Sequence, residues 1–282
     1  PLMFHGLGRQ GVTFNLSIPR NGGTTLPLTA HVGDIIFLLG ANGTGKSSLM
    51  HLFYREHHAK ARRMTAHRQS WFESNAISVS PLERGRHEHS IRINDRSPEG
   101  RWSDITPAAR ASIAIYDLVD SENVRARAIT EAVDRDNIDL AKELREEDAP
   151  IKVINELLRQ SNVPVTIAIE GNAQVVASKN GGTSYSIAEL SDGERNALLI
   201  AANILTAKPG SLLLIDEPER HLHRSIISPL LTLLFAKRPD CAFVVSTHDV
   251  MLPFDNPSAR TLLLRGCTYN GLEKGSVGAT YE

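Results

Sequence analysis

The chain has few cysteines, few aromatic residues and almost no net charge. Its two cysteines, Cys241 and Cys267, are too few for a disulfide scaffold or a cysteine-rich metal site, and we expect them to be buried, reduced apolar residues. A formal net charge of −1 argues against coating of nucleic acid by the whole chain, although a local contact with nucleic acid stays open. No stretch reaches the roughly 18 unbroken apolar residues of a membrane span, and residues 1–10 lack a signal-peptide core. We therefore expect a cytoplasmic protein without membrane contact.

The remaining composition is typical of a globular α/β protein. Hydrophobic residues make up 41% of the 282 residues and charged residues 22%. This length suits one large domain with an insertion, or two smaller domains.

The most informative segment is FLLGANGTGKSSL, residues 37–49. It contains Gly-x-x-x-x-Gly-Lys-Ser, the pattern of a phosphate-binding loop. The apolar run before it predicts a buried strand, and the apolar residues after it recur at helical spacing. Strand, loop and helix thus follow in the required order. The residues expected to bind nucleotide are Asn42, Gly43, Thr44, Gly45, Lys46, Ser47 and Ser48.

Each part of this loop has a physical role. The glycines let backbone N–H groups turn inward, and the helix N-terminus adds positive potential. Lys46 supplies a positive charge to the β- and γ-phosphates, and Ser47 places its hydroxyl on Mg²⁺. A chance match in a glycine-containing loop is the competing interpretation, and it should occur in roughly 1% of chains of this length.

Two further apolar runs end in residues suited to phosphate chemistry. SLLLIDEPE (residues 211–219) predicts a buried strand that delivers two carboxylates to the edge of a parallel sheet where ligands bind. We expect Asp216 to hold Mg²⁺ through a water and Glu217 to act as general base on the attacking water. The run CAFVVS precedes His248, which we expect to contact the γ-phosphate.

The segment ELSDGERNALL places Ser191 directly before an apolar helix. Serine is a common N-cap, and the N–H groups of such a helix start can bind phosphate. On its own the segment indicates a helix start; with the other motifs, Ser191 and Gly193 become candidate phosphate contacts.

The chain divides into three segments. Residues 1–103 hold an alternating strand at 12–18, the phosphate-binding loop and an arginine-rich stretch at 55–101 that predicts a solvated surface. Residues 104–160 have helical composition, a Thr-Pro start at 106–107, a break at Pro150 and more acids than bases. They predict two to four inserted helices, which either form an exposed projection that contacts a partner or pack as a lobe needed for folding.

Residues 161–282 are expected to complete the ATPase core. Two strands within 165–178, joined by a turn at Gly171, are predicted to bring the chain back to that core.

GANGTGKS, LSDGE, LLLIDEPE and STHD, in this order, resemble the ATP-binding-cassette superfamily. The second motif, LSDGE, departs from LSGGQ, the usual form of the superfamily's signature motif, at Asp192 and Glu194 but keeps Ser191 and Gly193. The resemblance implies an α/β P-loop NTPase with a mixed central sheet, an antiparallel N-terminal sheet and inserted helices. It also implies ATP and Mg²⁺ as cofactors. In such proteins two copies dimerise head to tail, and the signature serine of each caps the ATP held by the other.

The run DEPERHLH is similar to the DEPE-x-x-LH pattern of soluble ATPases related to the overcoming-lysogenization-defect family, which includes bacterial anti-phage systems. This implies ATP hydrolysis by a dimer or higher oligomer that controls an effector, such as a TOPRIM-type nuclease on another chain. Gln69 is the candidate for the glutamine that senses Mg²⁺ and the γ-phosphate. The alternative is the ATP-binding subunit of a membrane transporter.

Overall fold

A parallel five-stranded sheet forms the centre of the protein. The computed structural model describes residues 12–65, 79–101, 103–171, 174–273 and 276–281. The strands follow in the order β10 (Arg260–Leu263), β3 (Ile35–Leu39), β9 (Ala242–Thr247), β8 (Leu212–Asp216) and β4 (Ala61–Thr65). Each of these neighbouring pairs is parallel. The predicted α/β fold is confirmed, but the central sheet is parallel rather than mixed, because helix-containing connections join its strands.

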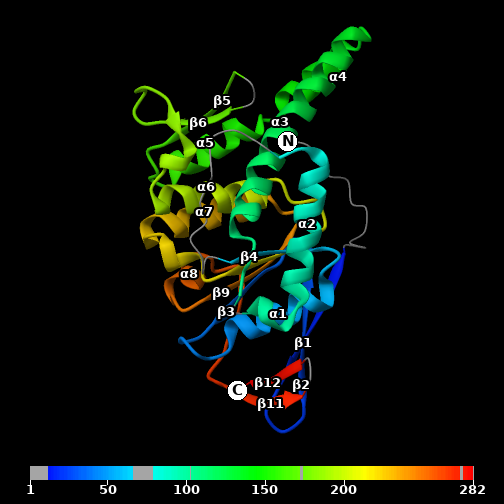
Figure 1. Cartoon of the computed structure of the whole chain (residues 1–282), viewed down its shortest axis with the longest axis vertical. Helices are drawn as coiled ribbons and strands as arrows, with labels where there is room; N and C mark the ends of the chain where they lie inside the picture. The colour runs from blue at the N-terminus through cyan, green and yellow to red at the C-terminus, as the bar shows by residue number, and fades with distance from the viewer. Residues whose placement is uncertain (1–11, 66–78, 102, 172–173, 274–275, 282) are drawn as a thin grey trace.

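Alternating residues of the central strands face two separate hydrophobic layers. On β3, Ile36 and Leu38 pack with α1 (Lys46–His57) and the N-terminal hairpin, whereas Phe37 faces the opposite layer. That second layer contains α3 (Pro107–Asp134), α5 (Pro150–Gln160), α6 (Asp192–Leu205) and α7 (Arg224–Lys237). Both faces of the sheet are therefore covered, as Figure 1 shows, which explains the unbroken apolar composition of its strands.

Two antiparallel hairpins lie at one end of the molecule (Figure 1). The predicted alternation at 12–18 forms β1 (Thr13–Pro19), which pairs with β2 (Thr25–His31). Near the C-terminus, β11 (Cys267–Glu273) pairs with β12 (Ser276–Tyr281), and a bridge between Arg20 and Tyr281 connects the two hairpins. This second hairpin was not predicted from the sequence.

Residues 104–160 form three helices, within the predicted range of two to four. Thr106 is the N-cap of α3, Pro107 its first residue, and Pro150 begins α5. α4 (Ile138–Glu146) packs against α3, and Figure 1 shows α4 with the second half of α3 extending away from the body of the protein. This helical hairpin, residues 120–149, is the part of the insertion that projects.

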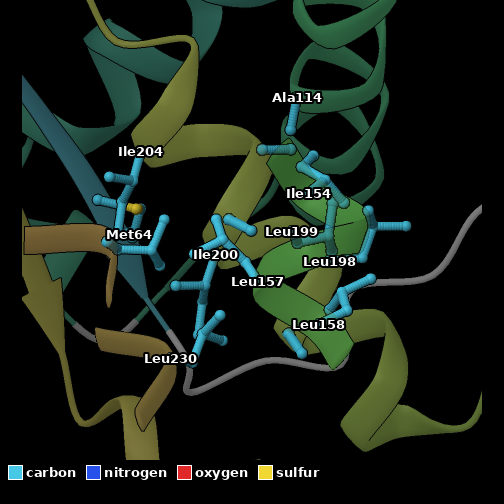
Figure 2. Packing of buried hydrophobic residues seen from close by; sticks show 14 of the residues in the cluster. Met64, Ala114, Ile154, Leu157, Leu158, Leu198, Leu199, Ile200, Ile204 and Leu230 are labelled. Carbon is cyan, nitrogen blue, oxygen red and sulfur yellow. The ribbon is translucent and has the colours of Figure 1, made fainter. Parts of the chain in front are cut away.

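The first half of α3 and all of α5 belong to the core. Leu118 and Ile154 are 0% exposed and Leu157 is 1% exposed. Figure 2 shows Ile154, Leu157 and Leu158 of α5 beside Leu198 and Leu199 of α6. The interpretation of 104–160 as wholly an exposed projection is therefore wrong, because apolar residues of α3 and α5 lie in the hydrophobic cluster that covers the central sheet.

Arginines of the 55–101 stretch pair with acids of the insertion in the same chain. Arg62 of β4 and Arg84 of α2 (Pro81–Arg96) both contact Asp117, at 3.2 and 2.7 Å. Arg110 of α3 pairs with buried Asp95 of α2. These partly buried pairs hold α2 against α3, so the stretch is more than a solvated surface.

The remaining elements surround this core. The predicted strands at 165–178 are β5 (Thr166–Glu170) and β6 (Gln174–Ser178), which form a separate antiparallel sheet with β7 (Tyr185–Ser186). Three short helical turns and α8 complete the described elements: η1 (Pro98–Arg101), η2 (Ile187–Glu189), η3 (Pro218–His221) and α8 (Met251–Asp255). None of the described helices is long and apolar enough to cross a membrane.

The two halves of the insertion should respond differently to deletion. Replacing residues 127–145 with a short glycine-serine linker should leave a cooperatively folded protein, because Arg125 already bonds Glu147 O at 2.6 Å across the base of the hairpin. Replacing 104–160 should abolish cooperative melting, since it removes core residues of α3 and α5. Circular dichroism melts measure both; a cooperative melt of the larger deletion would contradict this assignment of the core.

Candidate nucleotide-binding site

The predicted phosphate-binding loop connects β3 to α1. Gly43 and Gly45 both have φ of +84°, in the left-handed region that glycine adopts without strain. A side chain at Gly43 would meet nothing within 4 Å, so the loop has room for a ligand there. The first turn of α1 has neither an acidic residue nor a side-chain cap. The N–H groups at this helix start therefore suit an anion, as the sequence predicts.

Lys46 is buried between the loop and the predicted base. Its Nζ donates to Gly40 O at 2.9 Å and Ala41 O at 3.0 Å. The same atom lies 3.3 Å from Glu217 Oε1, and the two side chains are 3% and 11% exposed. The loop therefore holds a buried positive charge beside the catalytic candidate Glu217.

Asp216 and Glu217 lie at the carboxyl end of β8, as predicted. Ser246 of β9 joins them: its hydroxyl donates to Asp216 Oδ1, and its carbonyl accepts from Glu217 N at 3.0 Å. Glu217 has φ of +46°, a strained backbone conformation for a residue other than glycine. Residues with such strained conformations are found mainly at functional sites. The sequence analysis missed Ser246, although it stands in the STHD motif.

Arg63, a buried residue of the edge strand β4, lies beside Asp216. Arg63 of β4 lies 3.8 Å from Asp216 Oδ2 and donates to Gly100 O at 2.8 Å. Its side chain is 2% exposed. Sequence reasoning missed Arg63, because an arginine in a basic stretch gives no signal that its strand lies beside β8.

Glu219 holds the predicted γ-phosphate contact His248. Glu219 Oε1 accepts from Thr247 Oγ1 at 2.7 Å and from His248 N at 2.9 Å, and it lies 2.9 Å from His248 Nδ1. A partner at Nδ1 orients the imidazole and favours one tautomer. Glu219, the last residue of DEPE, thus orients the side chain of His248. The motif alone does not predict this contact. His223 of the same run instead caps α7 by accepting from Ser225 N.

Ser191 forms a capping box at the start of α6. Its hydroxyl accepts from Glu194 N, and Glu194 Oε2 accepts from Ser191 N at 3.0 Å. Lys179 lies 2.7 Å from Glu194 Oε1. Burial opposes ionisation of Glu194, but hydrogen bonds from Lys179 and Ser191 outweigh it and lower the pKa of its carboxyl. Glu194, one of the two departures from LSGGQ, therefore stabilises the turn that carries exposed Ser191 and half-buried Gly193.

The other predicted contacts occupy the loop or lie outside the described part of the chain. Thr44 Oγ1 donates to Ala41 O at 2.9 Å, which supports the loop. Gln69 falls outside the described residues. Among described residues no group of three or more His, Cys, Asp or Glu gathers as a metal site. Mg²⁺ does not need one, because it binds one or two carboxylates together with substrate phosphates and waters.

The family comparison covers the later motifs but not the phosphate-binding loop, which lies before the matched residues. A family profile described as "AAA domain, putative AbiEii toxin, Type IV TA system" matches residues 60–253. The chain belongs to this family. The match contains Ser191, Asp216, Glu217 and His248.

Other comparisons are more limited. A 65-residue segment, 23% of the chain, is 49% identical to a "Putative ABC transporter ATP-binding protein" of Streptomyces avermitilis, and it spans 11% of that relative. The Smc head bound to the C-winged helix domain of ScpA has 14% identity, 96% coverage of both chains and a TM-score of 0.48. The structure of RNase-L Inhibitor is 16% identical in sequence, with a TM-score of 0.45. Its match covers 96% of this chain and 38% of the RNase-L Inhibitor chain. Both TM-scores lie below 0.5 and support no inference about activity or partners.

The contact between Glu219 and His248 predicts coupled effects on phosphate chemistry. Glu219→Gln keeps an acceptor oxygen but removes the charge beside Nδ1, so it and His248→Gln should each slow ATP hydrolysis by roughly 10- to 100-fold. The loss of kcat in the double variant should be smaller than the product of the two single losses, because both substitutions remove the same interaction. A double-mutant cycle on kcat measures this, with exposed Glu143→Gln plus His248→Gln as the control. Independent, multiplicative losses for Glu219→Gln and His248→Gln would contradict the orienting role.

Proposed function

We propose that the protein binds and hydrolyses ATP at the loop of residues 40–48. The observation that carries this proposal is the convergence of Lys46 and Glu217 at the end of β8, 3.3 Å apart and largely buried. Lys46 would neutralise charge on the β- and γ-phosphates. Glu217 would accept a proton from the attacking water, and His248, oriented by Glu219, would contact the γ-phosphate.

The donor set also fits Mg²⁺. Ser47 at the start of α1 and Asp216 at the end of β8 are the proposed ligands, and the ion would neutralise phosphate charge. Gln69 stays a proposed third contact. Ser246 and Arg63 contact Asp216 and would fix the orientation of its carboxylate.

We further propose that two copies close head to tail around ATP. Ser191 and Gly193 lie at the start of α6, which the capping box with Glu194 stabilises. Ser191 is exposed there. A partner's γ-phosphate would accept from the Ser191 hydroxyl. ATP binding would thus close the dimer, and hydrolysis would open it.

The cycle would control an effector. The helical hairpin of residues 120–149 projects from the body and carries more acids than bases. Such a surface favours a basic protein partner over a phosphate backbone, which requires lysine and arginine. The family description names a toxin of a toxin–antitoxin system, and the proposed setting is anti-phage defence with a nuclease of TOPRIM type as effector.

The similarity to the Streptomyces relative supports a second candidate, the ATP-binding subunit of a membrane transporter. The two candidates predict different partners. Copurification with a membrane fraction would support the transporter, and copurification with a soluble nuclease would support the effector proposal.

Glu217→Gln tests the proposed ATPase. The variant should bind ATP normally but hydrolyse it more slowly by roughly a hundredfold or more, because it removes a positioned base. It should also accumulate as an ATP-bound dimer, measured on a sizing column with ATP and Mg²⁺. Glu143→Gln, an exposed carboxylate of α4, is the matched control and should behave as wild type. Wild-type turnover of Glu217→Gln would refute the assignment of the base.

A further inference from the structure

The C-terminal hairpin packs directly against the phosphate-binding loop. Cys267 Sγ of β11 lies 3.6 Å from Gly43 O, and Tyr281 Oη of β12 donates to Gly45 O at 3.3 Å. Burial raises the pKa of the Tyr281 hydroxyl, which keeps it protonated and able to donate. A Cβ on Gly45 would lie 2.7 Å from Cys267 Sγ, so this glycine is needed for close approach as well as for its φ. The hairpin therefore forms one wall of the loop.

The order of the central strands defines which end of a nucleotide this wall would meet. Glu217 follows β8 and His248 follows β9, and both strands lie on one side of the loop strand β3. β10 is the neighbour of β3 on the other side, and it leads into β11. A nucleotide with its γ-phosphate toward Glu217 and His248 would extend its nucleoside end toward β10 and the hairpin.

Tyr269 of β11 is placed on that nucleoside side. Its Oη lies 3.4 Å from Ser48 Oγ in the first turn of α1, and its side chain is 53% exposed. The other strongly exposed aromatic residue of the described chain is Phe254, in α8 after β9 on the γ-phosphate side. Tyr269 thus combines an accessible ring with a hydroxyl anchored beside the loop.

We propose that Tyr269 is the platform on which the nucleotide base stacks. The proposal rests on the proposed ATP binding and assigns binding of the nucleotide base to the C-terminal hairpin. Stacking on an aromatic face tolerates different bases, because every base has a π-face. The site should therefore bind ATP and GTP with similar affinity, while the loop and Lys46 bind the phosphates.

Equilibrium binding of ATP and of inorganic tripolyphosphate, measured by calorimetry, separates the base from the phosphates. Tyr269→Ala should weaken ATP binding by roughly 5- to 100-fold, because it removes one stacking partner. Tripolyphosphate affinity should not change. Tyr269→Phe should stay near wild type, Tyr269→Leu should resemble the alanine variant, and Phe254→Ala is the matched exposed-aromatic control.

The outcomes distinguish this inference from the proposed function. Unchanged ATP affinity in both Tyr269→Ala and Tyr269→Leu would overturn the base platform while leaving the ATPase proposal intact. Equal losses for ATP and tripolyphosphate would also overturn it, because Tyr269 would then support the loop rather than the base. If the wild-type protein bound neither ligand, the proposed function itself would fail, and the platform with it.

Discussion

The buried contact between Lys46 and Glu217 is the interaction on which the site depends. β9 separates the loop strand β3 from β8, so the two residues meet across the carboxyl edge of the sheet. Removing one member of a buried pair leaves the other charge uncompensated, which is costly. The pair therefore couples the shape of the phosphate-binding loop to the position of Glu217, the proposed general base, and a phosphate entering the loop would share Lys46 with Glu217.

The surrounding contacts hold this edge of the sheet in one arrangement. Ser246 connects Asp216 and Glu217, and Glu219 holds His248 from the strand end alongside. Because the end of β8 and the end of β9 are hydrogen-bonded to each other, these five residues have little freedom to move separately. Fixing polar groups in advance in this way is the main means by which proteins stabilise the transition state of phosphoryl transfer.

The sequence predicted the positions of residues that belong to local motifs and missed residues whose contacts depend on strand order. The loop, the carboxylates at the end of β8, the N-cap at Ser191, the helix start at Pro107 and the break at Pro150 all follow from short patterns. Arg63 and Glu219 gave no comparable signal, because their partners come from other strands. The C-terminal hairpin was missed for the same reason, since its packing against Gly45 is a contact between distant segments.

A complementation assay tests the central claim that two copies share each ATP site. Lys46→Ala lacks a functional loop but keeps Ser191, whereas Ser191→Arg keeps the loop but blocks the partner's site, so each variant alone should be inactive. Mixing them in equal amounts should restore about a quarter of wild-type ATP turnover, because half the dimers would then be mixed and each would hold one intact site. Turnover that stays at the level of the separate variants after mixing would contradict the shared site.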